Sequence, residues 1–129
     1  MSAAPLVLIV DDEPDIRLLA RLCLRGAGYR AADAGPEDAL ALAAREPPAV
    51  ALLDVLMPNP DGPALLRALR AAHDAALPVV FVTALDRVEV AARMGGEGGW
   101  DYLPKPFTAD ELLAAVARHL SRPTDTQPA

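Results

Sequence analysis

The chain has 129 residues, 53% of them hydrophobic, and a formal net charge of −6. This length suits a single domain with an ordinary core, and the hydrophobic fraction argues against a disordered chain. The acidic balance argues against a general nucleic-acid-binding surface, because such surfaces are normally basic. Cys23 is the only cysteine, so an internal disulfide is excluded and a reducing compartment fits. With no basic start for a signal peptide and no apolar run near the ~20 residues of a membrane span, we expect a cytoplasmic protein.

The start of the chain predicts a strand, a helix and a second strand. The continuous apolar run Leu6–Val10 is typical of a strand covered on both faces. Pro14 suits the first turn of a helix, and the glycines at 26 and 28 end that helix. The apolar residues that recur at helical spacing, and that we expect to face the core, are Ile16, Leu19, Cys23 and Ala27. Residues 29–32 form a weaker second strand.

The middle of the chain continues the alternation. Pro36 opens a helix over residues 36–44, and the prolines at 47 and 48 end it. Residues 50–54 form a third strand, which finishes on a carboxylate. A helix over residues 63–72 follows Gly62. The sequence thus repeats a strand–helix unit.

The last part of the chain holds two further units. Residues 78–83 are β-branched and aromatic, which favours a strand. A helix is expected over residues 86–94, and we hypothesise that it is unusually mobile because glycines crowd its end at a cost of ~1 kcal/mol per helical position. A fifth strand covers residues 100–103. Thr108 and Glu111 then form a capping box that opens a helix to about residue 120.

Five strands alternating with five helices predict an α/β fold, a doubly wound parallel sheet with helices on both faces. We expect one domain over residues 1–121. The segment 122–129 is polar and proline-bearing, which indicates a disordered tail.

Polar side chains collect at the predicted strand ends. Asp11 and Asp12 follow the first strand, Asp54 ends the third, Thr83 ends the fourth and Lys105 follows the fifth. In open α/β sheets ligands bind at the carboxyl ends of the strands. We therefore expect these five side chains to share one site.

The three carboxylates of this set predict a magnesium site. Neighbouring carboxylates disfavour each other's ionisation unless a cation offsets their charge, and Mg²⁺ prefers a few carboxylates with water. Asp12 and Asp54 are the expected direct ligands. Asp11 binds directly or through a water, and the backbone carbonyl of Leu56 supplies a further oxygen.

Magnesium alone leaves the hydroxyl and the ammonium unexplained, whereas a phosphoryl group explains both. A carboxylate can attack phosphorus and form an aspartyl-phosphate, a reaction that depends on positioning and charge neutralisation. Lys105 would neutralise phosphoryl oxygens and Thr83 would donate a hydrogen bond to one. Asp54, on a central strand, is the best candidate for the nucleophile.

Four segments give the chain a family resemblance. They are VDDEPDIR (10–17), LLDVLMPNPDG (52–62), VTAL (82–85) and DYLPKPF (101–107). Their order and spacing resemble the receiver domain of bacterial two-component response regulators, in particular the single-domain, chemotaxis-regulator type.

The resemblance implies a flavodoxin-like fold with strand order 2-1-3-4-5. It implies that Asp54 is the residue that accepts phosphate from a histidine kinase or phosphotransfer protein. Asp11, Asp12 and Asp54 would form the acidic Mg²⁺ pocket. The Lys105–Pro106 bond matches a pair that is usually cis in the family.

The resemblance also implies a switch. In the family a threonine moves to the phosphate and an aromatic residue turns inward behind it; Thr83 and Tyr102 occupy those positions. The fourth helix, fifth strand and fifth helix would form the surface for a downstream protein target. Ala115 replaces an arginine that DNA-binding members use for dimers, so we expect a monomer or weak dimer without direct nucleic-acid contact. No turnover of an external substrate is expected.

Other hypotheses compete with this one. The chain could be a pseudo-receiver, an interaction module that never takes phosphate. A phosphohydrolase of the haloacid dehalogenase type would want an acid where Leu56 stands, and a flavin carrier would want a phosphate loop after the first strand. Tyr102 could be a plain half-buried strand residue, Cys23 is expected in the core, and Trp100 is either an exposed partner contact or a cover for the sheet edge.

Overall fold

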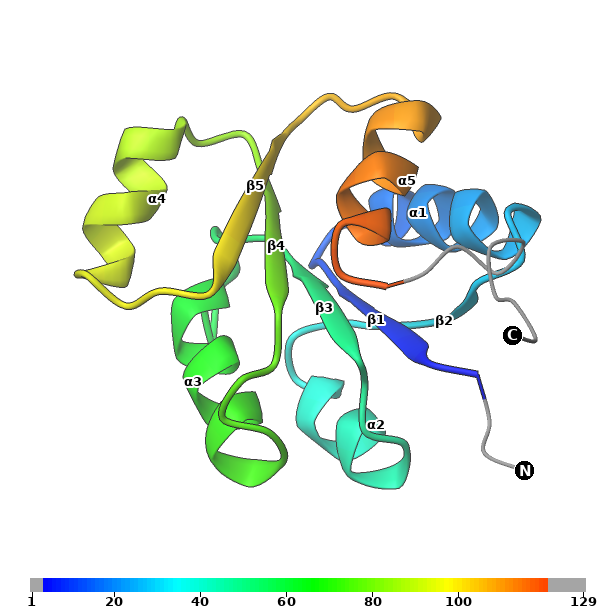
Figure 1. Ribbon diagram of the computed structural model, residues 1–129. Coiled ribbons are helices and arrows are strands. Elements are labelled where there is room, and N and C mark those ends of the chain that lie inside the picture. The colour runs from blue at the N-terminus through cyan, green and yellow to red at the C-terminus, as the bar shows by residue number, and fades with distance from the viewer. Residues whose placement is uncertain (1–3, 121–129) are drawn as a thin grey trace.

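The computed structural model describes residues 4–120, which hold five parallel strands in one sheet of order β2-β1-β3-β4-β5 (Figure 1). The strands are β1 (Leu6–Val10), β2 (Arg30–Ala34), β3 (Val50–Leu53), β4 (Val79–Thr83) and β5 (Trp100–Pro104). The helices are α1 (Pro14–Gly26), α2 (Ala39–Arg45), α3 (Gly62–Ala72), α4 (Arg87–Met94) and α5 (Ala109–Ala117). The predicted fold and strand order are confirmed, while the predicted tail lies outside the described residues.

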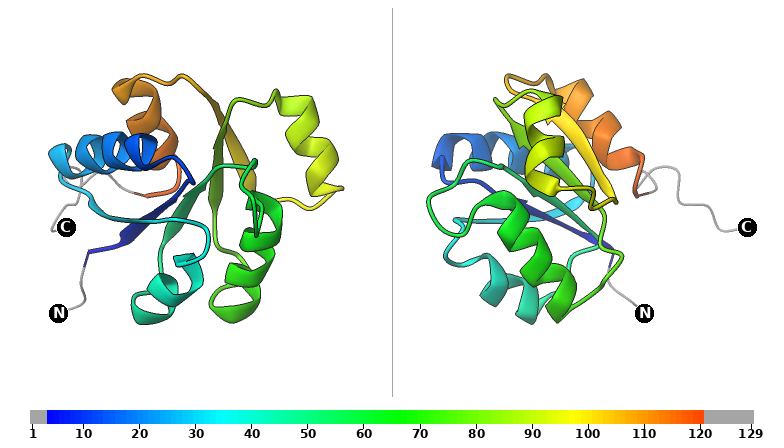
Figure 2. Two further views of the ribbon diagram at one scale, coloured as in Figure 1. Left: turned by 180° about the vertical axis from the view of Figure 1, so that it is seen from behind. Right: turned by 90° about the vertical axis from the view of Figure 1, so that its left-hand side faces the viewer.

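The sheet separates two helical layers. Helices α1 and α5 cover one face, and α2, α3 and α4 cover the other (Figure 2). Alternate strand residues point to opposite faces, so Ile9 and Leu52 pack towards α1 and α5 whereas Leu53 and Phe81 pack towards the other layer. Burial of each such side chain contributes ~1.5–3 kcal/mol. Burial on both faces explains why β1, β3 and β4 read as continuous apolar runs.

Strand β2 is longer than its residues suggested. It runs in parallel register with the whole of β1, from Leu6 opposite Arg30 to Val10 opposite Ala34. Pairing with β1 therefore sets the length of this strand, rather than the weak strand preference of its own side chains.

The buried face of α1 differs from the predicted one. Leu19 is 48% exposed, whereas Ala20 and Leu24 are buried. Cys23 packs against the core, as expected. The helix packs on the sheet beside α5, so Ala20 and Leu24 face the core while Leu18, Leu19 and Leu22 extend outwards (Figure 2).

The glycines after α4 follow the helix and do not interrupt it. The helix ends at Met94, and Gly95 caps it in the left-handed conformation with φ 61°. Glycine is the favoured residue at such a cap. The reason for expecting a mobile α4, glycines at helical positions, is therefore wrong, and the mobility itself stays a prediction.

Two smaller features complete the fold. The capping box of α5 is present, with Thr108 and Glu111 each accepting from the other's backbone N–H. The Lys105–Pro106 bond is cis, as the resemblance implied, and so is Asn59–Pro60. Within residues 4–120 no helix combines the length and the apolar character needed to cross a membrane.

Candidate functional site

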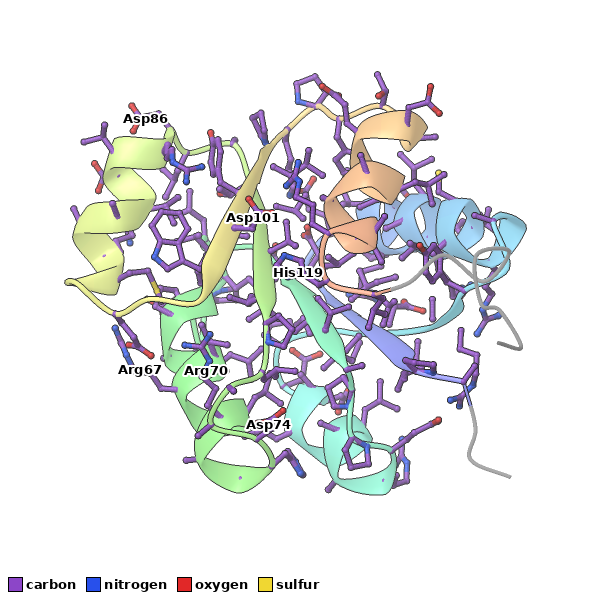
Figure 3. The ribbon with its side chains drawn as sticks, in the orientation of Figure 1. Arg67, Arg70, Asp74, Asp86, Asp101 and His119 are labelled. Atoms are coloured by element: carbon purple, nitrogen blue, oxygen red, sulfur yellow. The ribbon has the colours of Figure 1, made fainter. Side chains whose placement is uncertain are left out.

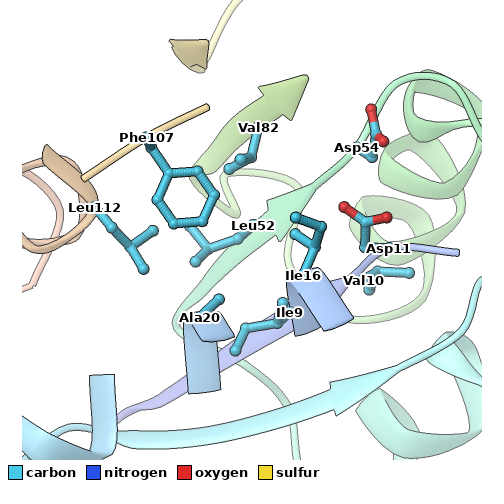
Figure 4. Close-up of a pocket in the computed structure, with 10 residues that line it drawn as sticks. All are labelled: Ile9, Val10, Asp11, Ile16, Ala20, Leu52, Asp54, Val82, Phe107 and Leu112. Atoms are coloured by element: carbon cyan, nitrogen blue, oxygen red, sulfur yellow. The ribbon is translucent and has the colours of Figure 1, made fainter. Parts of the chain in front are cut away.

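Three of the predicted side chains meet at the carboxyl edge of the central strands. The Lys105 Nζ lies 2.9 Å from Asp11 Oδ2 and 2.9 Å from Asp54 Oδ2. The two carboxylates project side by side from the ends of β1 and β3 (Figure 4). The side chain of Lys105 is 12% exposed, that of Asp11 is 3% exposed and that of Asp54 is 7% exposed. The predicted convergence of these residues is therefore present in the folded chain.

Each carboxylate is held in the same way. Asp11 Oδ1 accepts a hydrogen bond of 2.9 Å from the N–H of Glu13, and Asp54 Oδ1 accepts one of 3.2 Å from the N–H of Leu56. Aspartate commonly forms this contact with the backbone two residues on. One oxygen of each carboxylate is thus bound by its own loop, and the other faces Lys105.

Gly62 supports Asp54 from the start of α3. A Cβ added at this glycine would lie 2.3 Å from the Asp54 carbonyl oxygen and 2.9 Å from Val55 Cα. The Gly62 N–H also donates to the Val55 carbonyl at 3.0 Å. Close backbone approach of this kind requires glycine, so the last residue of the LLDVLMPNPDG segment places the candidate nucleophile.

An apolar floor lies beneath the carboxylates, with Ile9, Val82 and Phe107 among its residues (Figure 4). Burial raises the pKa of Asp11, although its hydrogen bonds with Glu13 and Lys105 oppose that effect. Burial alone would lower the pKa of Lys105.

Hydrogen bonds with Asp11 and Asp54, together with their charges, more than offset this burial and raise the pKa of Lys105 above its ordinary value. The ammonium therefore stays charged and offsets part of the negative charge of the buried pair.

Carboxylates beyond this pair complete what we call the acidic site. One oxygen from each of Asp11, Asp12, Glu13 and Asp54 can be chosen so that all lie within 4.8 Å of one another, and Asp12 and Glu13 are exposed. Such hard oxygen donors fit Mg²⁺ with bound water. Lys105 also reaches Glu13 Oε1 at 3.2 Å. Sequence reasoning missed Glu13, although the run of three consecutive acids was its signal.

The predicted switch residues meet at one backbone unit. Thr83 is fully buried, and its Oγ1 accepts a hydrogen bond of 3.3 Å from the Leu85 N–H. The Tyr102 hydroxyl donates to the Leu85 carbonyl at 2.6 Å. Lys105 joins them, because its N–H donates to the Thr83 carbonyl at 2.9 Å. The backbone of Leu85 is the link that the sequence did not reveal.

A cation sits over two aromatic rings beside this link. The guanidinium carbon of Arg87 lies 5.3 Å from the ring centre of Trp100 and 5.9 Å from that of Tyr102. Trp100 in turn packs on Phe81 and donates from Nε1 to the Glu97 carbonyl at 3.1 Å. Trp100 was expected either as an exposed contact for a partner or as a cover for the edge of the sheet, and these contacts fit the cover. We call Arg87, Trp100 and Tyr102 the α4–β5 face.

A family model described as the response regulator receiver domain matches residues 7–117. The DNA-binding transcriptional regulator NtrC of Salmonella typhimurium is 39% identical over 124 residues, or 95% of this chain. The response regulator MprA of Mycobacterium leprae is 41% identical over 118 residues, or 90% of this chain. The chain spans only 26% of the length of NtrC and 51% of MprA.

Solved structures agree with these relatives. The chemotaxis protein CheY4 of Vibrio cholerae superposes with a TM-score of 0.84 at 31% identity, covering 92% of this chain and 100% of CheY4. NtrX from Brucella abortus superposes with a TM-score of 0.81 at 34% identity, covering 92% of this chain and 27% of NtrX.

The chain belongs to the response regulator receiver domain family. Domains of this family are phosphoacceptor modules of two-component systems that bind Mg²⁺ in an acidic pocket and work with histidine kinases or phosphotransfer proteins. Membership decides against the phosphohydrolase and flavin-carrier hypotheses.

Proposed function

We propose that this chain is a phosphorylation-dependent signalling switch in which Asp54 accepts the phosphoryl group. The observation that carries the proposal is the contact of Lys105 Nζ with Asp54 Oδ2 and Asp11 Oδ2, both at 2.9 Å, inside a cluster of four carboxylates. A nucleophile, an acid neighbour and a charged lysine in one buried site are the parts that phosphoryl transfer needs.

The chemistry follows from these contacts. A carboxylate oxygen of Asp54 attacks phosphorus, the new P–O bond replaces the bond to the donor, and the donor leaves with that electron pair. Lys105, which now neutralises the carboxylate, then pairs with phosphoryl oxygens. Asp11, Asp12, Asp54 and the Leu56 carbonyl would hold a bound Mg²⁺, and the ion would neutralise further negative charge on the phosphoryl group.

The switch uses the backbone of Leu85. In the proposed phosphorylated state the Thr83 hydroxyl donates to a phosphoryl oxygen and gives up its contact with the Leu85 N–H. The Leu85 carbonyl also holds the Tyr102 hydroxyl, so a shift of this unit changes the surface of α4, β5 and α5. Phosphorylation thereby favours one of two arrangements of that surface.

The remaining parts of the proposal concern organisation and partners. We propose residues 1–121 as the receiver domain, acting as a monomer or weak dimer on a downstream protein. The phosphoryl donor is a histidine kinase or phosphotransfer protein, and the chain itself makes no direct contact with nucleic acid.

Intact mass spectrometry after treatment with acetyl phosphate and Mg²⁺ tests the assignment. Wild type should gain one phosphoryl unit and Asp54→Ala should gain none. Asp15→Asn, an exposed acid in the first turn of α1, is the matched control and should gain the same unit as wild type. A gain in Asp54→Ala would refute the nucleophile, and no gain in any protein would favour the pseudo-receiver.

A further inference from the structure

Arg17 is the last residue of the VDDEPDIR segment, and the proposed function gives it no role. It lies on α1 with its side chain 21% exposed. Its Nη1 donates to the backbone carbonyl of Asp11 at 2.8 Å, and its Nε donates to Asp33 Oδ2 at 3.2 Å. One guanidinium thus connects α1 and β2 to the backbone beneath the acidic site.

The carbonyl that Arg17 binds lies between two residues of the acidic site, Asp11 and Asp12. It belongs to the peptide bond between Asp11 and Asp12, whose six atoms lie in one plane. Holding this oxygen therefore orients the backbone of both acids. The Asp11 N–H is held from the other side by the Ala34 carbonyl at 3.4 Å. Without Arg17, the peptide plane between the two acids could rotate and carry the Asp12 carboxylate away from its neighbours.

A second arginine near Asp33 allows the contact with the Asp11 carbonyl to be distinguished from the ion pair with Asp33. Arg21 stands one helical turn after Arg17 and donates to Asp33 Oδ1 at 2.6 Å. Among the described residues, the side chain of Arg21 makes its hydrogen bond and ion pair with Asp33, whereas Arg17 also reaches the Asp11 carbonyl. The two arginines share an acidic partner and differ in the contact that matters.

We propose that Arg17, oriented by Asp33, is a positioning residue of the acidic site and that it raises the affinity for Mg²⁺. The inference rests on the proposed function, since it assigns Mg²⁺ to these carboxylates. The fork of the guanidinium makes both contacts at once, which the point charge of a lysine cannot do. Residues that orient metal ligands in this indirect way typically change metal affinity by 10–100-fold when they are replaced.

Isothermal titration with MgCl₂ tests the proposal on wild type, Arg17→Ala, Arg17→Lys and Arg21→Ala. We expect Arg17→Ala to weaken Mg²⁺ binding about tenfold or more and Arg17→Lys to fall between it and wild type. Arg21→Ala should stay within about twofold of wild type, because the Asp11 carbonyl keeps its donor. The unfolding midpoint of each protein, measured without metal, shows whether general destabilisation differs between the two alanine variants.

The rate of phosphorylation by acetyl phosphate adds a second readout. If Arg17 acts through the metal site, raising Mg²⁺ should restore most of the rate of Arg17→Ala, a rescue that a purely structural defect would not allow. Equal Mg²⁺ affinities in the two alanine variants would overturn the inference while leaving Asp54 as the acceptor. Absence of Mg²⁺ binding in wild type would overturn both the inference and the proposed function.

Discussion

Different forces hold the acidic site and the α4–β5 face. In the acidic site, Lys105 and two aspartates are at most 12% exposed and joined at 2.9 Å by charged hydrogen bonds. On the α4–β5 face, Arg87 lies 5.3 Å and 5.9 Å from two rings, and the neighbouring Val88 is 79% exposed. Directional hydrogen bonds define one geometry, whereas a cation over aromatic rings tolerates several.

The helices beside these regions repeat the contrast. Helix α3, which starts against Asp54, buries five residues, and α4 buries only Val90 and Met94. Phosphoryl transfer needs atoms held in place, while a signalling surface needs alternative arrangements of similar free energy. The proposed switch would thus combine a firmly held acidic site with a more loosely packed α4–β5 face, and variants in each region can separate the two.

The largest expected effect comes from Gly62→Ala. The new Cβ would lie 2.3 Å from the Asp54 carbonyl oxygen, and backbone atoms cannot yield as a flexible side chain can. We expect the free energy of unfolding to fall by about 3 kcal/mol or more, at the upper end of overpacking effects, with loss of phosphorylation in the protein that folds. Urea denaturation measures the first quantity.

Gly26→Ala is the control for this comparison. Nothing lies within 4 Å of a Cβ at Gly26, at the end of α1. Its free energy of unfolding should change by less than about 1 kcal/mol. Similar losses in the two variants would show that α3 does not approach Asp54 as closely as described.

Lys105→Met comes next, because it leaves two buried carboxylates without their cation. We expect a loss of about 2–3 kcal/mol without metal, below the range for fully buried pairs because the site opens to solvent. Mg²⁺ should raise the melting temperature of this variant more than that of wild type, since it replaces the missing positive charge. Thermal unfolding with and without MgCl₂ measures both effects.

Arg67→Met tests whether burial or distance decides this loss. Arg67 pairs with Glu97 at the same 2.9 Å, but the side chains are 50% and 32% exposed (Figure 3 labels Arg67). Exposed pairs contribute about 0–1 kcal/mol. If Arg67→Met lost as much free energy of unfolding as Lys105→Met, burial would not explain why the ion pairs of the acidic site are strong.

The sequence was informative about the acidic site because strand ends can be read from local patterns. Asp11, Asp54 and Thr83 each end or directly follow an apolar run, and Lys105 directly follows the fifth strand, so topology alone brings the four residues to one edge. Lys105 stands out further, as the single lysine among 12 lysine and arginine residues. The fold followed from the same alternation of runs and helical patterns.

The supporting residues could not be read in this way. Arg17 acts on a backbone carbonyl and Gly62 through close approach, and neither contact depends on a local pattern. The exposure of Leu19 has a related cause. The hydrophobicity of a residue shows that it can be buried, but the angle at which α1 packs on the sheet and α5 decides which of its apolar residues are buried. What the sequence leaves out is the tertiary geometry around the site.

On the α4–β5 face, Arg87→Ala should have a smaller effect than the changes in the acidic site. Losing the cation over the two rings should reduce the free energy of unfolding by about 1 kcal/mol and shift the emission of Trp100, the only tryptophan. Arg93→Ala, on the same helix and paired within residues 4–120 with Glu89 at 3.5 Å, should cost less than about 0.5 kcal/mol. An unchanged emission spectrum in Arg87→Ala would contradict the stacking.

The smallest expected effect concerns Asp101 of β5, which can be compared with Asp11. Burial raises the pKa of Asp11, and it acts in the same direction on Asp101. At Asp101, however, the Tyr102 N–H and the Arg118 guanidinium outweigh it and lower the pKa below the ordinary 3.8. Asp101 also lies 3.5 Å from His119 Nε2 (Figure 3).

Because folding lowers this pKa, the charged form of Asp101 stabilises the protein above pH 3.8, and the contribution disappears as the pH falls through the lower folded value. Asp101→Asn should therefore be about 0.5–1 kcal/mol less stable than wild type at pH 7, and the difference should shrink towards pH 3. Urea denaturation at several pH values measures it. A difference that grows on acidification would mean that burial dominates at Asp101 as it does at Asp11, and that the two regions are held by the same balance of forces after all.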